Sequence, residues 1–322
     1  MLQRALRQSL YIATTILCVA ATSQAALIVY DPYAIGNTPA NGEYVNNAEI
    51  HLTGPVIPGW TGVWDGNGSG TNTTFGAFRS VTGSLNYGNL VTSGGRLNYI
   101  RNSGINGTQK TMYRSSTDAT NPSTYYASFL VNISSEIVGH TNYNLVGLQF
   151  GADANSLLFG FSNTSTDALD SRPFLGTVAT AQMLSDSQGA ADTYNNTQTG
   201  TSSFALNSTH LVVLKVVNSG SGNEAISLYV DPTLGSLETE PGVATLTSSI
   251  DILPDAGSSL GRMFWVSNGS ASGSINQFDE IRVGTTWADV VPTAIPEPRS
   301  IALLGTLALG GMFALRRRRA VA

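Results

Sequence analysis

The stretch HLVVLKVVNSGSGNEAISLYVDP, from His210 to Pro232, holds two apolar segments separated by turn-forming residues. The first segment is apolar at successive positions, which is typical of a strand in the middle of a sheet. The second alternates, with Ser227 and Tyr229 on a face that we expect to be partly wet. An Asp-Pro pair then ends the pairing. The stretch therefore predicts an antiparallel hairpin.

Similar short segments, rich in Val, Ile, Leu, Phe and Tyr and bounded by Asn, Gly, Asp and Ser, recur along the chain. The predicted strands cover residues 26–30, 125–133, 145–150, 157–161, 210–218, 225–230, 263–267 and 278–283. No long segment has a helical period, and only GTTWADV, residues 284–290, suggests a short helical turn. The pattern predicts an all-β antiparallel sandwich or jelly roll.

The charge of the chain is unevenly distributed. Seven of its 16 basic residues lie at the two ends, at Arg4, Arg7, Arg299 and Arg316 to Arg319. The remaining nine face 21 acidic residues, so the body has a net charge near −12. Nucleic-acid binding needs clustered Lys and Arg, and the body cannot supply such a cluster.

The N-terminal segment has the three parts of a secretory signal peptide. Arg4 and Arg7 precede an apolar run, and Ser23-Gln24-Ala25 forms a small-x-small cleavage site. An uncleaved anchor is the alternative. The single cysteine, Cys18, lies inside this segment, so the mature chain would have no disulfide.

The C-terminal segment combines an apolar run with a block of arginines. Residues 299–315 are predicted to form a single transmembrane helix, and Arg316 to Arg319 follow directly. The positive-inside rule then places the C-terminus in the cytoplasm and the body outside. A glycolipid-anchor signal would lack the arginines.

Pro296, Glu297 and Pro298, the apolar run, and Arg316, Arg317, Arg318 and Arg319 together resemble the PEP-CTERM sorting signal of Gram-negative bacteria. The resemblance implies processing near the Pro-Glu-Pro by an exosortase-type membrane enzyme, after signal peptidase has cut behind Ala25. It also implies transient anchoring in the inner membrane and delivery to the cell surface or extracellular matrix, commonly with exopolysaccharide. The chain then divides into a signal peptide (1–25), a body (26–292) and a sorting signal (293–322).

The body resembles concanavalin A-like, laminin-G-like sandwich domains. The motifs that carry the resemblance are LIVYDPYAIG (27–36), PGWTGVWDGNGSG (58–70), LYVDPTLG (228–235) and FDEIRVGTTWADV (278–290). Residues 41–58 depart from the usual glycine-rich stretch, which leaves their conformation open.

The sequence gives little support for common classes of enzyme. His51, His140 and His210 are far apart, with surface or strand-end roles expected. GSGNEA, residues 220–225, fits a dinucleotide pattern, but a strand follows it where that pattern needs a helix. Asp279 and Glu280 are adjacent, so in a regular strand they face opposite sides and cannot form a glycosidase pair.

Two weaker signals point to ligands. Trp60 and Trp64 could stack on sugar rings, although their spacing equally fits a pair of core aromatics on one face of a strand, which we favour. Asp65, Asn67 and Ser69 resemble the start of a calcium loop, but Gly76 occupies the position of the required Glu, so a plain turn is favoured.

The sequence therefore predicts a non-catalytic exported protein of the cell surface or matrix, with a structural, adhesion or exopolysaccharide-associated role and no cofactor. The alternative is a lectin-like glycan-binding module, with or without calcium, and a glycan-active enzyme is the third candidate.

Overall fold

The computed structural model describes the body of the chain between Leu27 and Thr293, with gaps. The described residues are 27–36, 38, 42–50, 53–66, 77–100, 110–116, 122–134, 144–151, 156–163, 172–178, 194–199, 204–219, 222–234, 241–252, 262–267 and 275–293. The predicted signal peptide and the predicted transmembrane helix, 299–315, lie outside these ranges. Inside them, no helix has the length and apolar character needed to cross a membrane.

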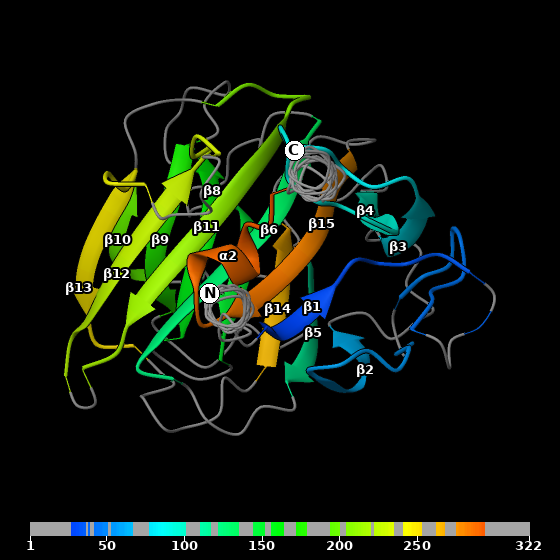
Figure 1. The fold of residues 1–322 in the computed structure, drawn as a ribbon, viewed down its shortest axis with the longest axis horizontal. Coiled ribbons are helices and arrows are strands. Elements are labelled where there is room, and N and C mark those ends of the chain that lie inside the picture. The colour runs from blue at the N-terminus through cyan, green and yellow to red at the C-terminus, as the bar shows by residue number, and fades with distance from the viewer. Residues whose placement is uncertain are drawn as a thin grey trace, which may run out of the picture.

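The described residues form 15 strands in two sheets, and neighbouring strands are antiparallel throughout (Figure 1). The eight-stranded sheet has the order β13 (Leu246–Ile250), β12 (Glu224–Val230), β11 (Thr209–Val217), β6 (Thr124–Ile133), β15 (Ile275–Gly284), β4 (Gly95–Ile100) and β3 (Ala77–Thr82), and β1 (Leu27–Asp31) also pairs with β15. The seven-stranded sheet has the order β10 (Tyr194–Thr199), β9 (Arg172–Val178), β8 (Leu157–Asn163), β7 (Asn144–Phe150), β14 (Arg262–Ser267), β5 (Lys110–Ser116) and β2 (Trp60–Gly66). The prediction of an all-β antiparallel sandwich is confirmed.

The hairpin predicted from His210 to Pro232 is formed by β11 and β12. Val216 pairs with Ile226 and Val212 with Val230, without a register shift. β11 lies between β12 and β6, which explains why it is apolar on both faces. The other six predicted strands are also present, and the short turn near the C-terminal end is α2 (Trp287–Val290), whose N-cap Thr286 forms a capping box with Asp289.

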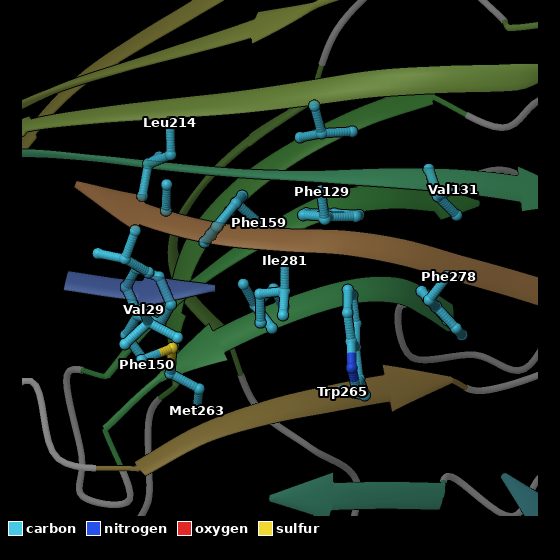
Figure 2. Packing of buried hydrophobic residues seen from close by; sticks show 14 of the residues in the cluster. Val29, Phe129, Val131, Phe150, Phe159, Leu214, Met263, Trp265, Phe278 and Ile281 are labelled. Carbon is cyan, nitrogen blue, oxygen red and sulfur yellow. The ribbon is translucent and has the colours of Figure 1, made fainter. Parts of the chain in front are cut away.

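The core lies between the sheets, where side chains from both inner faces interlock. Phe129 on β6 packs against Trp265 on β14, with ring centroids 5.2 Å apart, and against Phe159 on β8, at 5.7 Å. Figure 2 shows Phe129, Trp265 and Phe159 from close by, together with Ile281 and Phe278 of β15. Burying such aromatic and aliphatic side chains is the main stabilising term of the fold.

A second, smaller cluster covers the outer face of the eight-stranded sheet, and we call it the outer cluster. Its members are Leu85, Leu90, Tyr126, Leu130, Leu211, Val213, Tyr229, Trp287, Val290 and Val291. The face of β12 that carries Ser227 and Tyr229 is partly wet, as expected, since Ala225 is exposed and Ser227 is half-buried. Tyr229 itself is buried, because its ring packs edge-on against Trp287 with centroids 5.4 Å apart. Residues after β15 thus bury part of the outer face of β12, which the alternation of polar and apolar residues alone would predict to be exposed to water.

Strand β15 carries a bulge that divides its edge between two partners. Its first half, up to Phe278, pairs with β4, and its last part, from Ile281, pairs with β1. Between them the register with β6 shifts, and Glu280 has a φ of 54°. A positive φ is unusual for a residue with a Cβ, so the surrounding contacts must hold it.

The segment whose conformation the sequence left open is tied to the residues that follow β1 and to β3. Tyr44 forms a bridge with Ile35, and Glu49 forms one with Arg79 of β3. At the other end of the body, Thr293 bridges Leu90, one residue beyond the predicted boundary at 292. The described body is thus hydrogen-bonded from its first strand to its last residue.

Candidate functional site

The two predicted sugar-stacking tryptophans belong to the core. Both lie on β2, where Trp64 is fully buried and Trp60 is 6% exposed, and their ring centroids are 5.3 Å apart. The indole N–H of Trp64 donates to the hydroxyl of Tyr44, at 2.8 Å. A sugar cannot stack on a ring that is packed against protein, so the glycan-binding role of Trp60 and Trp64 is wrong and the core interpretation holds.

The hydroxyl of Tyr44 continues this network to a buried carboxylate. It donates to Asp31 at 2.6 Å, and the backbone N–H of Tyr33 donates to the other carboxylate oxygen at 2.9 Å. The hydroxyl of Tyr33 accepts a short hydrogen bond from the indole of Trp265 on β14. Burial raises the pKa of Asp31 to about 6, although the hydrogen bond from Tyr44 opposes the rise. The network joins β1 to the opposite sheet.

The bulge brings two further carboxylates into the interior. Asp279 accepts hydrogen bonds from the hydroxyl of Ser84 (2.5 Å) and from the backbone N–H of Leu85 (2.7 Å). Glu280 accepts from the backbone N–H of Ser93 (2.5 Å) and from the guanidinium of Arg282 (2.6 Å). Both carboxylates therefore hold the segment 83–94, which connects β3 to β4 at the edge of the sheet.

The same burial changes the acidity of this pair. Burial raises the pKa of Asp279 to about 8, and the neighbouring charge of Glu280 adds to the rise. Burial also raises the pKa of Glu280, while the positive charge of Arg282 opposes it. Perturbed carboxyls of this kind occur both at active sites and in structural networks. Here the hydrogen bonds to the two carboxylates come from the segment 83–94 and from β15 itself.

His210 lies at the start of β11, one of the two placements expected for it, and its side chain is buried. Its Nδ1 lies 2.6 Å from Asp231, and its Nε2 lies 2.8 Å from the carbonyl oxygen of Ala205. Burial alone would lower the pKa of His210, but the hydrogen bonds to Asp231 and Ala205 raise it above its usual value. His51 and His140 lie outside the described residues.

The predicted calcium loop is described only at its first residue. Asp65 accepts a hydrogen bond from the hydroxyl of Tyr113 on β5, at 2.8 Å. Asn67 and Ser69 lie outside the described residues, so the calcium prediction stays untested. Within the described ranges, no three His, Cys, Asp or Glu side chains gather as a metal site would require.

Asp65 and Tyr113 instead begin a row across the outer face of the seven-stranded sheet. Asp65 is paired with Tyr113, Tyr113 with Phe264, and Phe264 with Gln149 of β7. The residues on either side of Tyr113 and Gln149, such as Met112 and Leu148, point into the core, so this row faces outward.

Gln149 is the least satisfied polar group of this row. Its amide nitrogen donates to the carbonyl of Gly151 at 3.1 Å, but its amide oxygen is buried without a hydrogen-bond partner. Beside it, Gly147 faces Gly160 of β8 so closely that a Cβ on Gly147 would clash with the backbone of Phe159. Leu158, which also faces this side, is fully buried, so part of the face is covered.

No protein-family model matches the chain, and no curated protein is similar to it. Solved structures are similar in fold. An endo-β-1,4-glucuronan lyase from the fungus Trichoderma reesei has a TM-score of 0.46 and 13% identity, over 76% of this chain and 97% of the lyase. The globular domain of T. cruzi calreticulin has a TM-score of 0.39 and 11% identity, over 69% of this chain and 83% of that one. An alginate lyase mutant in complex with an alginate trisaccharide has a TM-score of 0.36 and 15% identity, over 70% and 95%.

The buried ionisable groups predict that stability falls as pH rises. A folded-state pKa above the unfolded value gives stability that is present below the unfolded pKa and lost as pH rises through the folded one. The stability that Asp31 contributes is lost between about pH 4 and about pH 6, and that of Asp279 between about pH 4 and about pH 8. Glu280 and His210 act in the same direction. We expect the thermal midpoint to fall as the pH rises from about 4 towards 9, each lost pKa unit costing about 1.4 kcal/mol at most.

Differential scanning calorimetry of the wild type and of Asp279→Asn checks this. The variant removes the carboxyl with the widest titration range, so its midpoint should depend less steeply on pH between 5 and 9. Asp251→Asn, at an exposed position, should keep the wild-type slope. A wild-type midpoint that rises between pH 5 and 8 would contradict the assignment.

Proposed function

We propose that this chain is an exported protein of the cell surface or extracellular matrix, sorted by an exosortase-type system. Its body, a concanavalin A-like sandwich, is non-catalytic and serves a structural, adhesion or exopolysaccharide-associated role. In this proposal the two processing signals of the sequence flank the body whose two sheets the structure describes.

One observation carries this proposal. The first described strand begins at Leu27, two residues after the predicted signal-peptide cleavage site behind Ala25. The last described residue, Thr293, bridges Leu90, and Pro296 of the sorting motif follows three residues later. Cleavage at both predicted sites would thus leave every described strand in the processed chain, which is what a processed surface protein requires.

The three buried carboxylates support the non-catalytic part. Glycan cleavage needs an acid and a base that both reach the substrate. Asp31, Asp279 and Glu280 instead accept hydrogen bonds from backbone N–H groups of Tyr33, Leu85 and Ser93, and all three are buried. Their role in the proposal is to hold the edge of the eight-stranded sheet.

Intact-mass spectrometry of the surface-associated form tests the sorting. We expect a chain that begins at Ala26 and ends near Pro298, because both signals are removed. Changing Pro296, Glu297 and Pro298 to Ala should leave the unprocessed chain in the inner membrane. An intact peptide containing Arg316 to Arg319 on the surface form would reject processing.

Glycan binding is the second candidate, and the buried orphan oxygen of Gln149 favours it. A ligand hydroxyl on the outer face of the seven-stranded sheet could donate to this oxygen. The Tyr113 hydroxyl and the Asp65 carboxylate, which are half-buried, lie in the same row. Hydroxyl-rich ligands suit such a row of amide, phenol and carboxylate groups.

A glycan array probed with the surface form tests this candidate. If the row binds sugar, Tyr113→Phe and Gln149→Ala should each weaken binding about three- to tenfold, as expected for one lost hydrogen bond. Tyr30→Phe, which removes a hydroxyl on the other sheet, is the matched control and should bind as the wild type does. Absence of binding to any glycan, or equal binding by all variants, rules the candidate out and leaves the structural role.

A further inference from the structure

The guanidinium of Arg114 on β5 is buried with most of its donors unused. The side chain is 2% exposed, and Nη2 donates to the carbonyl oxygen of Pro55 at 2.7 Å. Nε and Nη1 have no hydrogen-bond partner. Buried polar groups are almost always paired, so two orphan donors on one cation require an explanation.

Two more unused donors lie beside it. Trp60 on β2 has its ring centroid 5.6 Å from the guanidinium carbon, and its indole N–H has no partner. Ser116 is two residues after Arg114, on the same side of β5, and is paired in register with Trp60. Its hydroxyl also lacks a partner. Three neighbouring side chains at this corner of the sandwich thus carry four donor atoms without an acceptor.

The charge of Arg114 is not neutralised by a bound carboxylate. Among the described residues, Arg114 forms no ion pair. Asp31 is near enough for an electrostatic interaction with Arg114, but it accepts its hydrogen bonds from Tyr33 and Tyr44. Taking a charge out of water without a partner is costly. A water molecule could satisfy a donor here, but it could not balance the charge.

We propose that this corner, formed by Arg114, Trp60 and Ser116, binds a small monovalent anion such as chloride. An anion beside the guanidinium accepts from its unused donors and balances its charge. β2 is the last strand of its sheet, and the chain around Pro55, which accepts from Arg114, lies beside it. The ion has to be small, because Trp60 and Ser116 leave under a tenth of their surface exposed. The site lies on the core side of the sheet and is separate from the outward-facing row of Tyr113 and Gln149.

Anion-dependent thermal stability tests the proposal with the purified full chain. At constant ionic strength, replacing methanesulfonate with chloride should raise the thermal midpoint of the wild type by roughly 2 to 4 °C, because the ion binds only the folded state. Arg114→Met should lose this shift, and Trp60→Phe, which removes only one donor, should reduce it. Arg79→Met, which removes an arginine paired with Glu49 near the surface, is the matched control and should keep the shift.

A bromide-soaked crystal of the wild type locates the ion without any variant, and so covers the case in which Arg114→Met does not fold. We expect an anomalous peak within hydrogen-bond distance of Arg114 and the indole nitrogen of Trp60. Ordered water in this corner without a halide peak would overturn the proposal. So would a chloride shift that is equal in the wild type and in Trp60→Phe.

Discussion

The bulge in β15 is the constraint on which the rest of the sandwich depends. Because Glu280 takes a positive φ, Asp279 and Glu280 both turn into the protein and hold the segment 83–94 through the backbone N–H groups of Leu85 and Ser93. The pairing of β15 with β4 ends there, and the edge beyond it is taken up by β1. An N-terminal strand thus completes a sheet whose central strand comes from the C-terminal end of the body.

That placement has two consequences for the interior. It positions Asp31, Tyr33 and Tyr44 so that a chain of hydrogen bonds reaches Trp64 on β2 and Trp265 on β14, which links the sheets with polar as well as apolar contacts. It also brings the beginning of the body next to Gly284 of β15. The beginning of the body is thus paired with the eight-stranded sheet, and Thr293 near its end bridges Leu90 in the connection between β3 and β4.

The sequence predicted those parts of the fold that local pattern controls. Ile226 and Leu228 alternate with polar residues, and the apolar runs of β6 and β11 show central strands directly. Strands such as β13, with the sequence LTSSI, were missed because a polar edge strand has neither alternation nor an apolar run. The burial of Tyr229 was not predicted because α2, which covers it, comes from a segment 58 residues later in the chain, at Trp287. The candidate row of Tyr113 and Gln149 could not be predicted, since it depends on register across β14. Asp279 and Glu280 were expected on opposite faces because a regular pleat was assumed, and the bulge breaks that rule.

Native-state hydrogen exchange of the backbone amides of Leu85 and Ser93 tests the role of the bulge most directly. If the buried carboxylates hold the sheet edge, these two amides should be protected nearly as strongly as those of β6, and Asp279→Asn should weaken the protection of Leu85 together with that of β1. Exchange of Leu85 and Ser93 at the rate of exposed loop amides in the wild type, or β1 protection unchanged in the variant, would contradict the account.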